Sequence, residues 1–258
     1  MKTIEGWLPK IVKPRFNVIG CHITRTDFNG GVTELMKRIA SGEGGYICFT
    51  NVHASVIAHN DPAYLAALNQ SFMTLPDGKP LYWVGRAKGF RDIEQIAGPD
   101  FLPAVLGNSE KPSLRHYFYG GKPEVLGRLV ARLKQDNPLA EIVGSESPPF
   151  RPLTVEEDKE AVSRINRAKP HIVWVGLGAP KQELWMAAHA EALKPAVLMG
   201  IGAAFDFYGG GAKRAPKWIR ALGFEWLYRL VQEPRRLWRR YLVTNTLFIT
   251  YLLTGLLK

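Results

Sequence analysis

The chain has 258 residues, of which 46% are hydrophobic and 22% charged, so it is long enough to bury a sizeable core and has the composition of a folded soluble protein. Its net charge of +11 indicates an anionic partner: nucleic acid, phospholipid headgroups or a phosphorylated small molecule. Only Cys21 and Cys48 are cysteines, too few for a disulfide framework, and no Cys or His cluster has metal-ligand spacing. We therefore expect a reducing cytosol, with no signal peptide in Met1–Lys13 and no bound metal.

Short apolar segments alternate with helical patterns along most of the chain. This alternation predicts an α/β fold: a Rossmann-like, mostly parallel sheet with helices on both faces, whose ligands bind beyond the carboxyl ends of the strands. In chain order the predicted elements are strand Phe16–Ile19, helix Gly31–Ile39, strand Tyr46–Phe49, helix Ala54–Leu68 broken at Asp61-Pro62, strand Phe72–Leu75, helix Phe101–Leu106, strand His116–Tyr119, helix Pro123–Lys134, strand Glu141–Val143, helix Val155–Arg167, strand His171–Val175, helix Lys181–Leu193 and strand Ala196–Met199.

The composition changes at Gly209–Gly211, which divides the chain into a body, residues 1–208, and a C-terminal appendage, residues 209–258. The appendage holds +8 of the net charge of +11 and six Trp, Tyr and Phe residues among its cations. Its last helix is predicted to begin at Glu233-Pro234, and Tyr241–Leu257 carries no charge. That stretch contains four Thr and one Asn, so we expect a helix that lies on a membrane surface or packs on a partner, and not one that spans a bilayer.

Two strand-to-helix loops have the glycines and prolines that suit a phosphate site. Gly120 and Gly121 precede Lys122-Pro123 in the first loop. The second loop contains Gly176, Gly178, Pro180, Lys181, Gln182 and Glu183. Glycine lets the backbone approach a ligand closely, and free N–H groups at a helix start attract anions. A plain tight turn remains the alternative for each loop. Neither loop has the dinucleotide or Walker A fingerprint, although the fold leaves a nucleotide-dependent oxidoreductase open.

Three polar residues follow predicted strands. Asp77, in Leu-Pro-Asp-Gly, could take a proton from a substrate hydroxyl, or it could simply form an Asp-Gly turn. Asp206 has a similar predicted placement and the same two interpretations. Asn51 could hold a substrate hydroxyl or cap the helix that follows it.

Together these pieces resemble the WecG/TagA/CpsF family of bacterial glycosyltransferases, glycosyltransferase family 26. The likeness covers the chain from about Phe16 to its C-terminus. Many motifs stand in the order of the family, which makes the resemblance highly specific. They are Leu75–Gly78, Ile96–Asp100, Tyr119–Glu124, Val175–Glu183, Gly202–Phe207, Lys213–Trp218 and Leu222–Arg240.

The resemblance implies a cytosolic enzyme held peripherally at the inner face of the membrane. It would transfer a hexose from a UDP-sugar donor to a sugar on a polyprenyl diphosphate lipid, with inversion, in the biosynthesis of a cell-surface polysaccharide. The hexose could be N-acetylmannosamine, its uronic acid, glucose or a similar sugar. The implied partners are the donor, the lipid-linked glycan acceptor and an anionic membrane surface. A homo-oligomer is left open, because family members can self-associate.

The resemblance also assigns roles to residues. Asp77 is the implied catalytic base, Asn51 a polar residue of the pocket, and the appendage closes over the site. Gln95 stands where the family often has Arg, and Phe49, next to Thr50, stands where it favours Thr, so the donor sugar stays open. The candidate substrate-binding residues are Thr50, Asn51, Gln95, Gly120, Gly121, Gly176, Gly178, Pro180, Lys181, Gln182, Glu183, Asp206, Arg229, Arg236 and Arg239.

The sequence has no Asp-x-Asp motif of the kind that holds a metal on a nucleotide diphosphate. We therefore expect metal-independent transfer, with arginines and helix N-termini neutralising the diphosphate. Arg236 and Arg239 would share one face of the last helix, and Arg229 would come from the helix before it. Arg220 and Arg240 are interpreted as surface cations for lipid headgroups.

Two other classes of protein compete with an enzyme. The basic, aromatic tail could bind nucleic acid, but the apolar run that follows it suits lipid better. A non-catalytic, membrane-docked scaffold with the same fold is the other alternative, and the presence of Asp77 and Asn51 argues against it.

Overall fold

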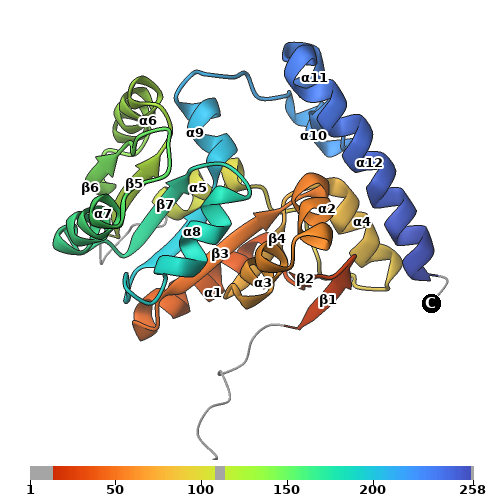
Figure 1. Ribbon diagram of the computed structural model, residues 1–258, viewed down its shortest axis with the longest axis horizontal. Coiled ribbons are helices and arrows are strands. Elements are labelled where there is room, and N and C mark those ends of the chain that lie inside the picture. The colour runs from red at the N-terminus through yellow and green to blue at the C-terminus, as the bar shows by residue number, and fades with distance from the viewer. Residues whose placement is uncertain (1–13, 108–113, 257–258) are drawn as a thin grey trace, which may run out of the picture.

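The computed structural model describes residues 14–107 and 114–256, so the expectation for Met1–Lys13 lies outside the described residues. Its eight described strands form two sheets (Figure 1). The strands are β1 Arg15–Val18, β2 Cys21–Thr24, β3 Gly45–Thr50, β4 Met73–Pro76, β5 Arg115–Gly120, β6 Glu141–Glu146, β7 Ile172–Gly176 and β8 Val197–Gly200.

The larger sheet has six parallel strands in the order β4-β3-β8-β7-β5-β6. The predicted Rossmann-like parallel sheet is therefore confirmed. The connection after β7 leads to β8, toward one edge of the sheet, whereas the connection after β5 leads to β6, at the other edge. Such a reversal opens a crevice outside the carboxyl ends of the two strands, and β5 and β7 are neighbours there.

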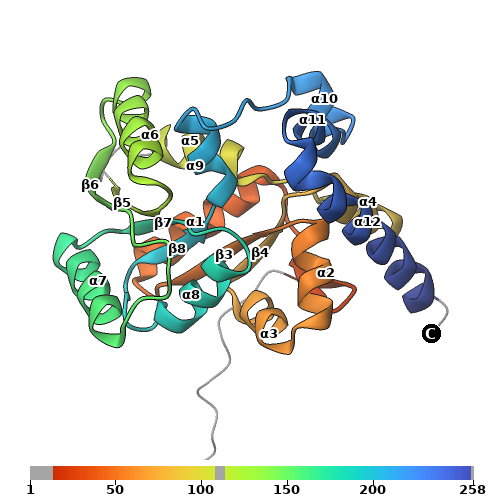
Figure 2. The same ribbon diagram turned by 45° about the horizontal axis from the view of Figure 1, so that its top comes forward.

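Helices cover both faces of this sheet, and three more follow in the appendage (Figures 1 and 2). Parallel strands need such crossover connections because the chain must return from the end of one strand to the opposite end of the sheet, where the next strand begins. The helices are α1 Phe28–Ser41, α2 Val52–Asn60, α3 Pro62–Gln70, α4 Lys79–Ala87, α5 Gly98–Gly107, α6 Pro123–Asp136, α7 Val155–Ala168, α8 Lys181–His189, α9 Gly202–Tyr208, α10 Lys217–Ala221, α11 Glu225–Gln232 and α12 Pro234–Leu256.

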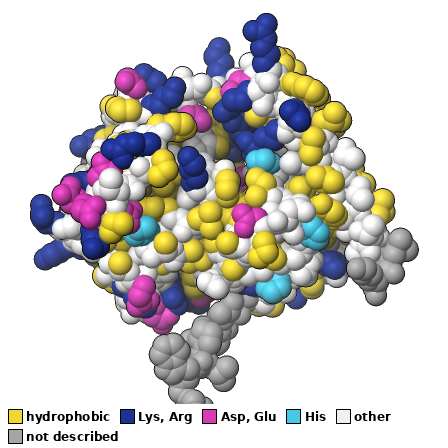
Figure 3. All heavy atoms as spheres, viewed as in Figure 1, with side chains coloured by type: hydrophobic (Ala, Val, Ile, Leu, Met, Phe, Trp, Pro, Cys, Tyr) yellow, Lys and Arg dark blue, Asp and Glu magenta, His cyan; other side chains and the backbone are white. Residues whose placement is uncertain are grey.

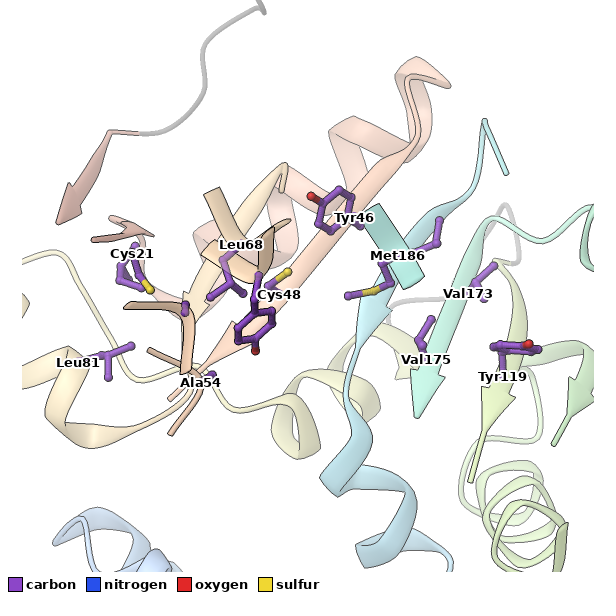
Figure 4. Close-up of a cluster of buried hydrophobic side chains, with 14 of the residues drawn as sticks. Cys21, Tyr46, Cys48, Ala54, Leu68, Leu81, Tyr119, Val173, Val175 and Met186 are labelled. Carbon is purple, nitrogen blue, oxygen red and sulfur yellow. The ribbon is translucent and has the colours of Figure 1, made fainter. Parts of the chain in front are cut away.

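The core has two halves because successive side chains of a strand point to opposite faces. Tyr46 and Cys48 of β3 pack in one half, with residues of α2, α3 and α8 (Figure 4). Ile47 and Phe49, their neighbours on the same strand, pack in the other half with residues of α5, α6 and α9. All four side chains are at most 6% exposed, so β3 is covered on both faces.

Local signals fix several helix starts. The Asp61 side chain accepts hydrogen bonds from the N–H groups of Ala63 and Tyr64, and Pro62 opens α3. The predicted break at Asp61-Pro62 therefore separates two helices, α2 and α3. Thr154 and Glu157 form a complete capping box at the start of α7.

Some expectations were incomplete or wrong. The predicted strand Phe16–Ile19 is present as β1, but it pairs antiparallel with the unpredicted β2 in a separate two-stranded sheet, because the chain reverses at Ile19 and Gly20 with positive φ at both residues. Helix α8 ends at His189, before the predicted Leu193. Helices α4 and α9 were missed because each begins within three residues of the end of a strand, next to residues interpreted as a turn or as a strand end.

The appendage contains α10, α11 and α12, and the last of these begins at Pro234, as predicted. Helix α12 runs beside α2 (Figures 1 and 2). There the Tyr251 ring packs against His59 in a tilted arrangement, 4.1 Å between ring centroids, and Tyr251 Oη donates to Asn60 Oδ1 at 3.3 Å. The long helix thus packs on the body of its own chain, and its predicted place on a membrane surface or on a partner stays a prediction. Among residues 14–107 and 114–256, no helix is both long enough and apolar enough to cross a lipid bilayer.

Candidate active site

A cavity of about 610 Å³ lies between the body and the appendage. The body contributes the residues that follow β3 and β4, together with α4, and the appendage contributes α11 and α12. Lys and Arg side chains gather near the top of the face seen in Figure 3, between α9 and α11. The cavity therefore lies where the carboxyl ends of parallel strands meet the basic appendage, which is the place where α/β proteins bind ligands.

Asp77, at the end of β4, lines this cavity, and its neighbours hold it in place. The Asp77 N–H donates to the Thr50 carbonyl at 2.9 Å, and Gln95 Nε2 donates to the backbone carbonyl of Asp77 at 2.6 Å. Asn51 Oδ1 accepts from the Ala54 N–H at 3.2 Å and so caps α2, while the Asn51 amide donates to the Asp77 carboxylate. The helix-cap interpretation of Asn51 is therefore confirmed, and its contact with a substrate hydroxyl stays a prediction.

The surroundings of Asp77 give its carboxyl an unusual affinity for protons. Burial raises the pKa of Asp77 to about 7, and the negative charge of Glu225 adds to this, whereas Arg214 and the Asn51 hydrogen bond act in the opposite direction. A carboxyl with a pKa near neutrality can take up a proton during a reaction and release it afterwards. Asp77 thus has the position and the proton affinity of a general base.

Two arginines of the appendage are tied to the body by Asp100, in the first turn of α5. Arg214 makes a bidentate pair with the Asp100 carboxylate, at 2.7 and 2.6 Å, and approaches Glu225 at 3.4 Å. Arg220 Nη1 donates to the same carboxylate at 3.1 and 3.2 Å. Both arginines line the cavity, so the interpretation of Arg220 as a surface cation was wrong.

Two further arginines line the cavity without an ion pair to any described residue. Arg229 lies over the ring of Phe207, 5.4 Å from its centroid, and Arg229 Nε is buried with no hydrogen-bond partner in the described structure. Arg240 lies on the side of α2, near His53. Burial and this neighbouring cation lower the pKa of His53 to about 4. These two guanidinium groups are available to an anion. Arg240 is exposed, as its interpretation as a surface cation predicts, and it also lines the cavity.

The other predicted arginines lie differently. Arg236 and Arg239 are both on α12, but neither lines the cavity. Arg236 pairs with Glu233 at 2.5 Å, and Arg239 is exposed. Asp206 lies inside α9, not at a strand end as expected. Burial raises its pKa above the usual value, although the nearby Arg229 and Arg236 act in the opposite direction.

The two glycine loops lie side by side beyond β5 and β7. The Gly121 N–H donates to the Gly176 carbonyl at 3.0 Å, and a Cβ on Gly120 would come within 2.6 Å of the Gly176 backbone. Only glycine fits at position 120, because its φ is also positive. The reversal of strand order thus brings the two predicted phosphate loops together, although neither lines the cavity described above.

In the second glycine loop, some residues are buried and hold the loop in place, whereas others lie at the surface. Gln182 Oε1 accepts from the N–H groups of Gly178 and Gly202, each at 3.2 Å, and Gln182 Nε2 donates to Glu183 Oε1 at 2.8 Å. Gln182 is 5% exposed and Glu183 is 1% exposed, so they hold the loop from beneath. Lys181 is exposed, near the ring of Phe150, and Pro180 is half-buried beside it.

Sequence reasoning missed Asp100, Arg214, Glu225 and His53 as residues of the site. Asp100 and Arg214 stand in motifs that were recognised, yet no pattern shows that residues 114 positions apart are paired. Arg240 was noticed and given another role, because helical spacing alone does not say which face of a helix meets the body.

A carboxyl group with a pKa near 7 shares one cavity with arginines that have no ion pair to a described residue, at the carboxyl ends of a parallel sheet, and such a site suits group transfer from an anionic donor. Residues 16–258 match the family model described as glycosyl transferase WecG/TagA/CpsF family. The chain therefore belongs to this family and is a glycosyltransferase.

Two curated relatives have the same printed name, N-acetylglucosaminyldiphosphoundecaprenol N-acetyl-beta-D-mannosaminyltransferase. The relative from Bacillus spizizenii strain W23 is 32% identical over 200 residues, which are 78% of this chain and 76% of the relative. The relative from Bacillus subtilis strain 168 is 33% identical over 199 residues, 77% of this chain and 75% of the relative.

Proposed function

We propose that the protein transfers a hexose, with inversion, from a UDP-sugar to a sugar carried on a polyprenyl diphosphate. The names of the two Bacillus relatives support an acceptor of this class. The observation that carries the proposal is Asp77, a carboxyl with a pKa near 7 in a cavity that also holds the free guanidinium groups of Arg229 and Arg240. The reaction needs one base and a cationic site for a departing diphosphate.

The reaction is a single displacement. The Asp77 carboxylate takes the proton of the acceptor hydroxyl, and the hydroxyl oxygen forms a bond to the anomeric carbon of the donor sugar. The bond between that carbon and the UDP oxygen breaks, and its electron pair leaves with UDP. Because attack and departure lie on opposite sides of the carbon, the anomeric configuration inverts. Asn51 orients the Asp77 carboxylate through its amide.

Negative charge grows on the UDP diphosphate during this step, and cations stabilise it most strongly where water is excluded. Arg229 is the main candidate, because it faces Asp206 and Phe207 of α9 on the side of the glycine loops. Transfer would need no metal. In a test with EDTA, turnover should stay unchanged, whereas a strict requirement for Mg²⁺ or Mn²⁺ would contradict the role given to the arginines.

The appendage also has features of a membrane-docking surface. Trp218, Trp238, Leu242 and Leu253 are each more than half exposed, and arginines such as Arg235 lie among them. Exposed aromatic and basic side chains suit the interface of an anionic bilayer. We therefore propose peripheral attachment at the cytoplasmic face of the membrane, where the lipid-linked acceptor of a cell-surface polysaccharide would be found.

The donor sugar is tested by a screen. The purified protein is incubated with single UDP-sugars, including UDP-N-acetylmannosamine, its uronic acid and UDP-glucose, and with a synthetic lipid-diphosphate glycan. Release of UDP and the mass of the extended glycan are measured. One donor should give both signals. Failure of every donor with every lipid-linked acceptor would contradict the proposed function.

A further inference from the structure

The cavity has a second part that the transfer reaction itself does not use. Beyond Asp77 and the arginines, its lining becomes apolar. Helix α4 contributes Val84 and Ala87 there, and α12 contributes Phe248, Ile249 and Leu252. Phe248 is 4% exposed, so it belongs to the inner wall and not to the outer surface. We call this part, lined by these five residues, the apolar limb.

One stripe of α12 joins the apolar limb to a cation. The stripe begins at Arg240, continues over Thr244 and reaches Phe248 and Leu252, with a spacing of four residues throughout. Side chains four apart share a face of a helix, and twelve residues span about 18 Å. Along this length the same face of α12 changes from charged at Arg240, to hydroxylated at Thr244, to apolar at Phe248 and Leu252.

This lining fits an amphiphile with an anionic group followed by a hydrocarbon chain. Under the proposed function on which this inference rests, the UDP-sugar has no such chain, whereas the acceptor has one directly attached to its diphosphate. We propose that the apolar limb binds the first isoprenoid units of the acceptor and that Arg240 contacts the acceptor diphosphate. The lipid then enters between α4 and α12, and its sugar reaches Asp77.

The neighbours of Arg229 and Arg240 indicate which of the two binds the donor diphosphate and which binds the acceptor diphosphate. Arg229 faces α9, where it affects the pKa of Asp206 and lies over Phe207. Arg240 lies near α2, where its charge lowers the pKa of His53, and it is close enough to Arg229 for the two positive charges to act on each other. His53 Nδ1 is buried and has no hydrogen-bond partner in the described structure, so it can bond to a ligand at this place. Arg229 therefore serves the donor and Arg240 the acceptor.

Membrane docking by α12 does not explain why apolar side chains of this helix line the cavity. A docking surface needs apolar side chains that face outward, as Leu242 and Leu253 do, at 63% and 58% exposure. The apolar limb instead lines the same cavity as Asp77 and α4, and its Phe248 is buried, although its Ile249 is also 58% exposed. An assay without a bilayer therefore separates binding of the isoprenoid chain by the apolar limb from attachment of the protein to a membrane.

The experiment uses soluble acceptors with one to four isoprene units on the same sugar-diphosphate headgroup, below their aggregation concentration and without vesicles or detergent. For the wild type, kcat/KM should rise by about tenfold or more from one to three units, because each added unit buries apolar surface. Leu252→Trp, which fills the limb, should abolish this rise, so that the three-unit acceptor is used no better than the one-unit acceptor. Leu253→Trp, on the outer face, should retain the rise.

Arg240 is tested in the same assay. Arg240→Gln should lower kcat/KM for every acceptor by about tenfold through the acceptor KM, with the donor KM unchanged, and Arg235→Gln is the matched control. Transfer that is equally efficient at all chain lengths, a retained rise in Leu252→Trp, or a raised donor KM in Arg240→Gln would overturn the inference alone. If no acceptor is used at any chain length, the proposed function fails, and this inference fails with it.

Discussion

The body and the appendage differ in how they hold their side chains. The body buries a two-sided core around a parallel sheet, and its acid, Asp77, is held by the backbone and by Asn51. The appendage buries few large side chains, chiefly Leu237 and Phe248, and exposes many. Its stability therefore depends on the body, while the body depends on the appendage for the cations of the cavity. The site exists only where the two regions meet.

The contact also sets the chemistry of Asp77. Glu225 and Arg214 both belong to the appendage, and they act on the pKa of Asp77 in opposite directions. Asp100 of the body holds Arg214, so it also controls where that positive charge lies. The following predictions separate the contributions of the two regions.

The largest expected effect is that of Asp77→Asn in the body. Turnover should fall by about a thousandfold, because an amide cannot take the proton, while UDP binding is retained. Burial raises the pKa of Asp77, so ionisation of this carboxyl destabilises the folded protein as the pH rises through 7. The variant should therefore melt at a higher temperature than the wild type at pH 8. Near-normal turnover would remove Asp77 from the role of base.

Next comes Arg229→Gln in the appendage. Loss of this cation should lower kcat/KM for the donor by about a hundredfold, because the departing diphosphate loses a charged partner. The control is Arg235→Gln, a change of the same kind at an exposed position of α12. Equal activity of the two variants in steady-state kinetics would show that Arg229 does not meet the donor.

The pH profile links the two regions. Below pH 7, Asp77 takes up a proton and can no longer act as a base, so kcat/KM should fall by about tenfold per pH unit. The residual activity of Asp77→Asn should not show this decrease below pH 7. Parallel profiles for the two proteins would assign the titration to another group.

The smallest effect is expected for Asp100→Asn. This change weakens the attachment of Arg214 and Arg220 to α5 and should raise KM by about fivefold, with faster amide hydrogen exchange in α10 and α11. Glu191→Gln, which weakens an exposed pair with Lys194, is the matched control. Unchanged exchange in the appendage would mean that this pair does not hold the two regions together.

The sequence predicted much of the body correctly, and the reasons are local. Strand-helix alternation showed the parallel sheet, and Asp61-Pro62 showed the break between α2 and α3. The hairpin of β1 and β2 was missed because a short segment of alternating residues does not reveal which strand it pairs with. Asp206 was misplaced because α9 has only seven residues, too few for a helical period to be recognised.

Motifs and the likeness to the family singled out Asp77, Asn51, the glycine loops and the basic appendage, because these are properties of neighbouring residues in the chain. Tertiary structure decided which charges meet. It paired Asp100 with Arg214, turned Arg240 toward the cavity and Arg239 away from it, and raised the pKa of Asp77 by burial. Electrostatic interactions and burial depend on distances in space, and residues more than a hundred positions apart acquire those distances only when the chain folds.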